Sequence, residues 1–430
     1  MVLSPGQATV GANMQPLVDL VYFNAGGGHR AAAQALQQAI ALQQRSWQVR
    51  LVNLTEVLDP QGLFRRLTGI EPEDLYNKRL ASGFTLGLAQ ELKLLQAGIR
   101  LAHPTLVQRL GAHWQGTAPD LVVSLIPNFN RALADSLALA RPQAPFVTVL
   151  TDMADHPPNF WVEPGVDQQL VCGTAHAVQQ ALAAGVPAAR IHQVSGMILR
   201  PAFHAAAQAL HTPLFDRRAA RLRAGLPADG ATGLVMFGGA GSQVMKHIAR
   251  ELPDTPLVLM CGRNAALART LREQTARAPR VVVEFTPDVA QWMALADFFI
   301  GKPGPGSLSE AVHMGLPVIV TRNAWTMPQE RWNTDWVRSQ GLGVVLRRFS
   351  DVAQGVQQVL QNLPVLRAQV QAVHNRAVFE VPDVLQRLLQ GLPQAVPTAM
   401  SAAMSAAMSA DTSASLTVPR CTAQPTPSPA

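Results

Sequence analysis

The ten residues 301–310, with the sequence GKPGPGSLSE, connect two apolar segments of the chain. The run that ends at Ile300 predicts a buried strand, and the apolar periodicity over 308–314 predicts a helix that starts there and stops at Gly315. Such a turn leaves the first N–H groups of the helix unpaired and its positive dipole end exposed. The turn is therefore a candidate phosphate site.

Four residues of this turn are candidate ligand contacts. Gly304 and Gly306 let a ligand approach the backbone, and Ser307 stands at the expected N-cap. Glu310 follows one turn later, where its carboxylate can hold a sugar diol beside the phosphate. The alternative is an ordinary strand–turn–helix connection, which every α/β protein contains.

Two more glycine turns stand between a predicted strand and a predicted helix. The first follows a strand over 17–23 and comprises Gly27, Gly28 and His29. The second follows a strand over 234–237 and comprises Gly239, Gly241 and Ser242. A bare glycine cluster is a weak signal on its own, but three such junctions in one chain indicate repeated strand–helix units.

Strands and helices alternate throughout both halves of the chain. Further strands are predicted at 49–54, 121–126, 146–150, 170–172 and 191–194, and then at 257–261, 281–285, 298–300, 318–321 and 344–346. This alternation predicts an α/β fold with two doubly wound, Rossmann-like domains, joined near 200–215. Ligands of such sheets bind beyond the carboxyl ends of the strands, and two facing domains form a cleft between them.

The composition favours a globular protein with an anionic partner. The chain has 430 residues, of which 48% are hydrophobic and 15% charged, and its net charge is +7. A nucleotide or an acidic membrane surface fits this charge, whereas nucleic acid is disfavoured because basic and aromatic residues do not interleave. The three cysteines are far apart and form no CxxC pair, so we expect no disulfide framework.

The two ends of the chain carry no folding pattern. Residues 1–16 form a loose leader without the features of a signal peptide, and residues 393–430 form a low-complexity tail that repeats AMSA. We expect both to be disordered. No apolar run reaches the roughly 20 residues that a membrane-spanning helix needs, so we expect a soluble or peripheral protein.

Residues 61–111 interrupt the alternation with a predicted helical segment. It mixes basic residues with many leucines, a composition that can lie on an anionic bilayer. The alternative is a helical subdomain with its apolar side packed inward, because several glutamates dilute the basic face.

His29 and Asp152 are the candidate catalytic residues. His29 begins a helix, whose N-terminus disfavours the imidazolium and lowers the pKa of the ring, so a neutral general base is expected. Asp152 follows the strand over 146–150 at its carboxyl end. It can orient His29, share the proton relay or bind an acceptor hydroxyl. Asp155 and His156 lie nearby, but their ligand set is too incomplete for a metal site, and we expect no metal.

Three further candidates follow strands of the second half. Arg263 comes directly after the strand over 257–261 and can pair with a phosphate, although a surface role fits nearly as well. Gln329 and Glu330 follow the strand over 318–321 and can bind sugar hydroxyls, or can simply begin a polar helix.

Together these motifs resemble glycosyltransferase family 28, and in particular the monogalactosyldiacylglycerol synthases and related bacterial glycolipid glycosyltransferases. The residues that carry the resemblance are AGGGHRAAAQAL at 25–36, VTVLTDMADHPPNFW at 147–161, VSGMILRPAF at 194–203, FGGAGS at 237–242, CGRN at 261–264 and KPGPGSLSEAVHMGLPVIV at 302–320. The resemblance covers about residues 17–390 in the same order.

The resemblance implies a GT-B fold, with an acceptor-binding domain over 17–205 and a UDP-sugar-binding domain over 206–392. His29 matches the family's glycine-loop histidine near the acceptor, and Glu310 matches the carboxylate that binds the uridine ribose. Ser307 and the glycines match diphosphate contacts, and Phe285 falls where the uracil is held. Gln329 and Glu330 fall where the donor hexose is read. The second position of that motif is Glu330, where the related N-acetylglucosaminyltransferase has Gln.

The resemblance also implies a reaction and its partners. These are an inverting, metal-independent transfer of a hexose from UDP-galactose or UDP-glucose to diacylglycerol or a related lipid, with no cofactor. It implies a cytoplasmic protein, peripheral on the inner face of the cell membrane, and it favours membrane contact for 61–111. The alternatives are an undecaprenyl-linked N-acetylglucosaminyltransferase, a UDP-N-acetylglucosamine 2-epimerase and a non-enzymatic nucleotide-sugar-binding protein.

Overall fold

The computed structural model describes residues 15–24, 27–62, 66 and 88–391. Most of the expected leader, the stretch 67–87 of the expected helical insertion and the expected tail over 393–430 lie outside the described residues. The described residues form two six-stranded sheets, and all strand pairs in both are parallel. The predicted α/β fold class with two doubly wound sheets is therefore confirmed.

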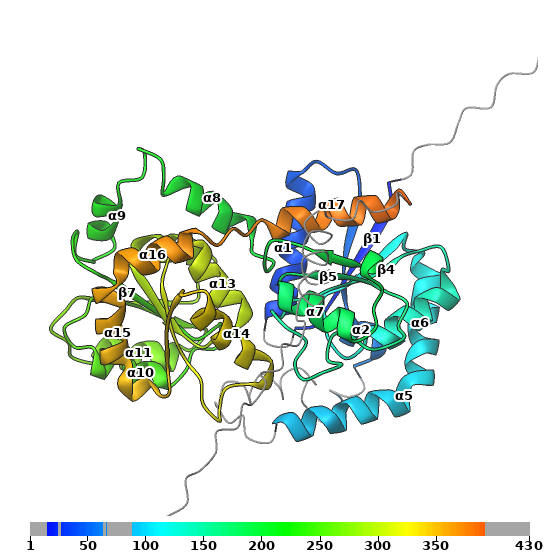
Figure 1. Cartoon of the computed structure of the whole chain (residues 1–430), viewed down its shortest axis with the longest axis horizontal. Coiled ribbons are helices and arrows are strands. Elements are labelled where there is room, and N and C mark those ends of the chain that lie inside the picture. Colours follow the sequence, from blue (N-terminus) through cyan, green and yellow to red (C-terminus); the bar gives the residue numbers. More distant parts are fainter. Residues whose placement is uncertain (1–14, 25–26, 63–65, 67–87, 392–430) are drawn as a thin grey trace, which may run out of the picture. The chain divides into compact units, whose positions relative to one another are not determined.

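The first sheet has the strand order β2-β1-β3-β4-β5-β6 (Figure 1). Its strands are β1 (Leu17–Tyr22), β2 (Gln48–Asn53), β3 (Leu121–Ser124), β4 (Phe146–Val149), β5 (Gln169–Cys172) and β6 (Ile191–Gln193). The helices between them are α1 (Gly28–Leu42), α2 (Leu54–Leu58), α5 (Leu88–Thr117), α6 (Asn130–Ala140) and α7 (Ala175–Ala183). The chain adds β2 on one side of β1 and β3 on the other, so the sheet has a topological switch point between β1 and β3.

The second sheet has the strand order β12-β11-β10-β7-β8-β9. Its strands are β7 (Gly233–Met236), β8 (Leu257–Gly262), β9 (Arg280–Glu284), β10 (Phe298–Gly301), β11 (Val318–Thr321) and β12 (Gly343–Leu346). The helices between them are α10 (Val244–Glu251), α11 (Ala265–Glu273), α12 (Val289–Leu295), α13 (Pro305–His313) and α14 (Pro328–Ser339). Here the switch point lies between β7 and β10.

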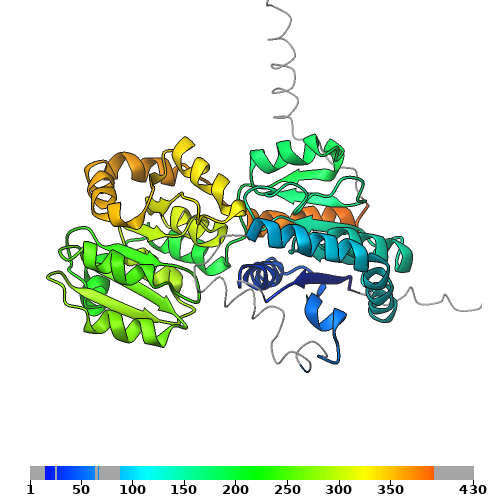
Figure 2. The same cartoon turned by 90° about the horizontal axis from the view of Figure 1, so that it is seen from below.

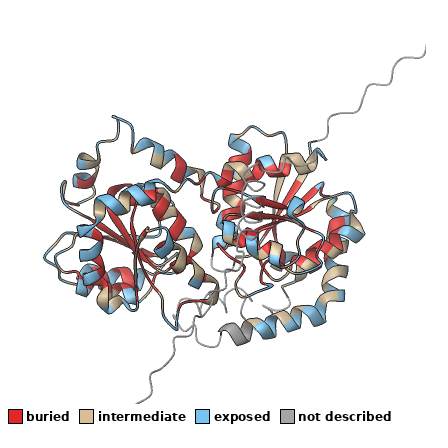
Figure 3. Cartoon of the chain, viewed as in Figure 1, coloured by how far each residue is buried: buried red, intermediate tan, exposed pale blue. Residues whose placement is uncertain are grey.

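The strands form where the sequence has short apolar runs, because both faces of each sheet are covered by helices (Figures 1 and 2). Every residue of β3, β4, β7, β10 and β11 is buried. In Figure 3, where buried residues are red, the strands are mostly red. The first sheet separates a core containing Leu20 from a core containing Trp114. The second separates a core containing Phe299 from a core containing Phe298.

The segments outside the alternating units connect the two halves. α8 (Pro201–Ala209) and α9 (Arg217–Arg223) follow the first sheet, and α15 (Val352–Gln361) and α16 (Leu363–Gln371) follow the second. The last helix, α17 (Ala377–Leu389), returns to the first half, where Val378 and Val381 join the same core as Leu36 of α1. The two helices lie side by side in Figure 1.

The helix after β10 starts earlier than the sequence pattern predicts. α13 begins at Pro305, with Gly304 as its N-cap, so Ser307 lies in the first turn and the prediction that it is the N-cap is wrong. Proline suits the first helical position because its missing N–H would be unpaired there and its φ is already helical. The predicted end is confirmed, since Gly315 adopts φ +77° just after the helix.

α5 accounts for the described part of the expected helical insertion. Leu110 and Trp114, near its C-terminal end, are buried in the core of the first half. Near its start, Leu94, Leu95 and Leu101 are exposed, at 73%, 51% and 85%. None of the helices in the described ranges is both long enough and apolar enough to cross a membrane.

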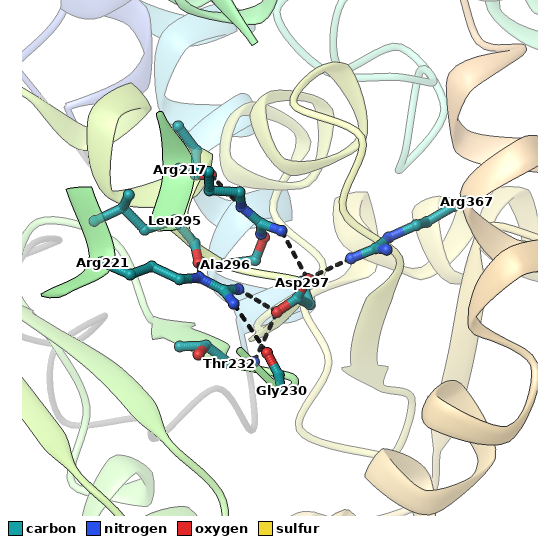
Figure 4. Close-up of polar contacts among 9 residues, drawn as sticks. Arg217, Arg221, Gly230, Thr232, Leu295, Ala296, Asp297 and Arg367 are labelled. Atoms are coloured by element: carbon teal, nitrogen blue, oxygen red, sulfur yellow. Dashed lines mark hydrogen bonds and ion pairs between the residues drawn. The ribbon is translucent and has the colours of Figure 1, made fainter. Parts of the chain in front are cut away.

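One buried carboxylate organises the polar contacts beneath the second sheet (Figure 4). Asp297 accepts hydrogen bonds from Arg217 at 3.1 Å, from the backbone N–H of Thr232 at 2.8 Å, and from Arg221 and Arg367. Burial acts to raise the pKa of Asp297, but Arg217, the Thr232 N–H and Arg221 outweigh it, and the pKa lies below the usual 3.8. The carboxylate therefore stays ionised and ties α9 and α16 to the end of α12.

We expect Asp297→Asn to destabilise the protein by about 3 kcal/mol, because it leaves the buried guanidinium of Arg221 and the half-buried ones of Arg217 and Arg367 without a counter-ion. Since the folded pKa is depressed, this contribution is present above pH 3.8 and is lost as the pH falls through the folded pKa. Urea unfolding at neutral and acidic pH measures both effects. Asp229→Asn is the matched control, since Asp229 forms an exposed pair with Arg218. Equal stability of the two variants would contradict the assignment.

Candidate active site

His29 lies at the switch point of the first sheet. It is the second residue of α1, whose N-cap is Gly27 with φ +76°. Its Nδ1 lies 3.1 Å from the hydroxyl oxygen of Thr151, which follows β4. Burial lowers the pKa of His29 to about 4, while a backbone hydrogen bond to Leu125, just after β3, acts in the opposite direction. This low pKa agrees with the expected neutral imidazole, and its main cause is desolvation.

Asp152 stands next to Thr151, but its carboxylate contacts a different ring. Its Oδ2 accepts the indole N–H of Trp161 at 2.9 Å, and the Trp161 ring centre lies 6.1 Å from that of His29. The side-chain hydrogen bond of His29 is therefore to Thr151 and not to Asp152. Asp155 accepts the backbone N–H groups of Asn159, Phe160 and Trp161, so it holds this loop in place.

Charged groups in the second half of the chain shift the pKa of Asp152. Burial raises it to about 7, and the Trp161 hydrogen bond opposes this rise. Glu330 raises it further and Lys302 lowers it, so both charged groups lie close enough to act on Asp152. Near pH 7, Asp152 therefore changes between its neutral and ionised forms.

The glycine turn after β7 is fastened to the end of β8. The backbone N–H of Arg263 donates to the carbonyl of Gly239 at 2.8 Å, and the Asn264 side chain donates to that of Ala240 at 3.3 Å. A Cβ on Gly241 would lie 2.7 Å from the Cys261 carbonyl, so only glycine fits there without movement. Ser242 lies just before α10, and its hydroxyl accepts the N–H of Val244 at 3.3 Å.

Arg263 and Phe285 form an exposed pair beside this turn. The Arg263 guanidinium lies 4.1 Å from the centre of the Phe285 ring, and Phe285 is 56% exposed. A large exposed aromatic ring with a cation on one face offers its other face for stacking. Arg263 also lies near the first glycines of the turn, since its Nη1 would be 3.8 Å from a Cβ on Gly239.

The space beside Gly306, in the first turn of α13, is not filled by other atoms. A Cβ on Gly306 would meet no atom within 4 Å, and the same holds for Gly27 and Gly28 at the start of α1. Ser307 lies half-buried in the first turn of α13. The first N–H groups of α13 lie beside the switch point of the second sheet, which is where doubly wound sheets bind their ligands.

Glu310 lies one turn further along α13. Burial raises the pKa of its carboxyl group to about 7, and Arg200 lowers it. Arg200 precedes α8 and donates to the Pro287 carbonyl at 2.9 Å. Arg200 therefore links the carboxylate of α13 to the loop that follows Phe285.

Glu330 is buried and forms an ion pair with the half-buried Lys302. The Lys302 ammonium donates to Glu330 Oε1 at 2.8 Å, and a Cβ on Gly304 would lie 3.3 Å from the same oxygen. Gln329 is half-buried in the first turn of α14. Asn333 donates to the Pro303 carbonyl at 2.8 Å, which holds α14 against the turn before α13.

The structure thus assembles the predicted residues into three groups. His29 and Asp152 lie around Trp161, Arg263 and Phe285 lie beside Gly239, and Glu330 lies beside Gly304. Sequence analysis assigned no site role to Thr151, Trp161 or Arg200, and it gave Lys302 the same two interpretations as Arg263, a phosphate contact or a surface residue. The signal for Thr151 and Trp161 was present, because both stand in the motif over 147–161 that carries the family resemblance.

Comparisons with known proteins agree with this fold and indicate a type of enzyme. The family model described as monogalactosyldiacylglycerol (MGDG) synthase matches residues 29–197. A probable monogalactosyldiacylglycerol synthase 2 of Oryza sativa subsp. japonica is 28% identical over 362 residues, 78% of this chain and 72% of that protein. A processive diacylglycerol beta-glucosyltransferase of Bacillus pumilus is 26% identical over 309 residues, 70% of this chain and 71% of that protein.

Among solved structures, the glycosyltransferase of kitacinnamycin has a TM-score of 0.53 at 16% identity, covering 87% of this chain and 99% of that one. At this identity the similarity shows the GT-B fold alone. The relatives and the family model add the type of enzyme. The chain is a glycosyltransferase that is similar to the monogalactosyldiacylglycerol synthases over most of its length.

Proposed function

We propose that this enzyme transfers a hexose from UDP-galactose or UDP-glucose to the hydroxyl group of diacylglycerol or a related lipid, with inversion at C1. The observation that supports the transfer most directly is electrostatic. Asp152, beside the His29 loop of the first half, is acted on by Lys302 and Glu330 at the glycine turn of the second half. A candidate base and a candidate diphosphate site therefore lie within one electrostatic environment.

In the proposed reaction His29 accepts the proton of the acceptor hydroxyl group. The oxygen forms a bond to C1 of the hexose while the bond from C1 to the UDP oxygen breaks, and the bonding electrons leave with UDP. Thr151 holds the imidazole ring, and burial keeps it neutral in the free enzyme. An ionised Asp152 nearby would stabilise the imidazolium that forms.

The donor contacts are proposed on the second half. The N-terminus of α13, with Gly304, Gly306 and Ser307, would bind the diphosphate and stabilise the charge that develops on it. The exposed Phe285 ring offers a face for the uracil, with Arg263 on the other side. Glu310 would bind the ribose, and Gln329 and Glu330 the hexose. Because the helix dipole and cations supply the positive charge, we propose that no metal ion or cofactor is needed.

The acceptor side is proposed to contact an anionic membrane surface. Leu94, Leu95 and Leu101 of α5 are exposed, and Lys93 and Arg100 lie among them. Exposed apolar side chains next to basic ones are typical of helices that lie on a bilayer. Such a contact would bring a lipid hydroxyl group to the enzyme on the cytoplasmic side, without nucleic acid as a partner.

The alternatives differ in acceptor or in reaction class. An undecaprenyl-linked N-acetylglucosaminyltransferase would use the same base and a different donor pocket. A UDP-N-acetylglucosamine 2-epimerase shares the two-domain fold but transfers nothing, and a nucleotide-sugar-binding protein would release no product. The relatives that match over most of this chain carry the names of transferases acting on diacylglycerol, which favours the first proposal.

We expect incubation with radiolabelled UDP-galactose or UDP-glucose and phosphatidylcholine vesicles containing diacylglycerol to give a labelled glycolipid. UDP-N-acetylglucosamine with an undecaprenyl-linked acceptor is the comparison. Vesicle flotation with and without anionic lipid tests the α5 contact, with Leu94→Ser/Leu101→Ser as the variant. Label transfer only from UDP-N-acetylglucosamine would contradict the donor proposal, and flotation unchanged by the variant would contradict the contact.

We expect His29→Ala to reduce the transfer rate by a factor of about 100 to 10,000, the range for loss of a general base, while UDP still binds. Steady-state kinetics and calorimetric titration with UDP measure the two effects. Thr151→Val is the matched variant, because it removes the hydrogen bond and keeps the ring, so its loss should be smaller. Loss of UDP binding together with transfer would refute the role of His29 as a base.

We expect kcat/KM to rise with pH through about 7, where Asp152 ionises, and to reach a plateau above it. Because the pKa of Asp152 is raised, the carboxylate that favours the imidazolium is present only on the alkaline side. Asp152→Asn should give a low rate without this rise. Glu310 also has a pKa of about 7, so Glu310→Gln is the control. A rise that persists in Asp152→Asn and disappears in Glu310→Gln would assign it to Glu310.

A further inference from the structure

A cavity of about 700 Å³ lies away from the candidate active site. Its wall is formed by α8, the start of α9, the ends of α12 and α13, α16 and the segment over 373–376. It includes none of the residues assigned above to the base or the UDP-sugar. Its volume is within the range of small-molecule sites.

The cavity is lined by cationic and imidazole side chains. Arginines contribute at three positions and histidines at four, namely Arg217, Arg367, Arg376, His204, His211, His313 and His374. Among the described residues that line it, none is an aspartate or a glutamate. A cavity with this lining attracts anions.

The charge of the arginines is only partly neutralised. Arg217, Arg221 and Arg367 share a single carboxylate, that of Asp297, as Figure 4 shows, so this cluster keeps an excess of positive charge. Arg376 adds to it. Its guanidinium lies 5.8 Å from the centre of the Phe379 ring, and no carboxylate in the described part of the chain pairs with it.

His204 supplies a second, independent sign of a missing ligand. The side chain is buried, with 8% exposure, and its ring packs against those of His313 and Phe379 at 4.4 and 5.0 Å. The Nε2 atoms of His204 and His313 are both buried without a hydrogen-bond partner. Burial, His313 and Arg376 lower the pKa of His204 to about 4. Buried polar atoms are normally paired, so these two nitrogens indicate that a polar group belongs beside them.

We propose that this cavity is a binding site for a phosphate group, carried by a small phosphate monoester or by a lipid headgroup. Phosphate oxygens accept the forked N–H groups of arginine, and they also accept an imidazole N–H. The excess guanidinium charge, the lack of lining carboxylates and the two unpaired imidazole nitrogens all fit this chemistry. The volume exceeds that of phosphate alone, which leaves room for the group that it esterifies.

Calorimetric titration of the full chain with inorganic phosphate and with glycerol 1-phosphate tests the site. We expect binding that Arg376→Gln weakens about tenfold, the effect of losing one charge-assisted hydrogen bond. His204→Phe keeps the ring and removes the nitrogens, so it should also weaken binding. Thermal unfolding of each variant shows whether the fold is intact. Arg223→Gln is the matched control, because Arg223 is exposed on α9 and does not line the cavity.

Two further experiments distinguish this cavity from the donor site, and a free phosphate ester from a lipid headgroup. Arg263→Gln tests whether the anion binds instead beside the glycine turn of the donor site. Flotation with phosphatidylcholine vesicles, with and without phosphatidic acid, tests a headgroup. Weakening by Arg376→Gln and His204→Phe in the soluble arm supports a free ester, and weakening only in the vesicle arm supports a headgroup. The proposal is overturned if neither arm responds to these variants, or if only Arg263→Gln weakens binding.

Discussion

The strand order of each sheet, with its topological switch point, is the constraint on which the rest of this structure depends. In both sheets the chain adds strands on one side of the first strand and then continues on the other side. At the two carboxyl ends beside this reversal, no crossover helix can cover both loops, so the loops stay open. His29 follows β1 at one reversal, and the turns around Gly239 and Gly304 follow β7 and β10 at the other. Parallel strand order therefore decides which few loops are available for chemistry.

Burial then sets the protonation states of the groups on those loops. Desolvation favours the uncharged form, so it lowers the pKa of His29 to about 4 and raises those of Asp152 and Glu310 to about 7. The same effect gives a neutral imidazole and two carboxyl groups that ionise near neutral pH. A diphosphate or a ribose hydroxyl group beside them would change these pKa values again, so the protonation states of the free enzyme would differ from those of the enzyme with bound substrate.

The sequence predicts the strands well, because each is a short apolar run between polar turns, and parallel strands are buried on both faces. The glycine turns are also predictable, because each is a short local pattern between an apolar run and a predicted helix. The prediction for the start of α13 is wrong because Pro305, which suits the first helical position, starts the helix two residues before Ser307. Pairings across the chain were not predictable. Thr151 with His29, and Arg200 with Glu310, join segments more than a hundred residues apart, and apolar periodicity carries no information on such distances.

Glu330 shows how such a distant pairing changes the meaning of a sequence feature. The related donor motif has Gln at this position. A carboxylate here places a negative charge near the proposed diphosphate, and that charge alone would oppose diphosphate binding. The structure gives it a partner, because Lys302 donates to Glu330 at 2.8 Å beside Gly304. The pair is neutral as a unit, and a carboxylate oxygen that is not used by Lys302 can still accept a sugar hydroxyl. A glutamate at this position can therefore still accept a hydrogen bond, as a glutamine carbonyl would, while it binds Lys302 beside Gly304.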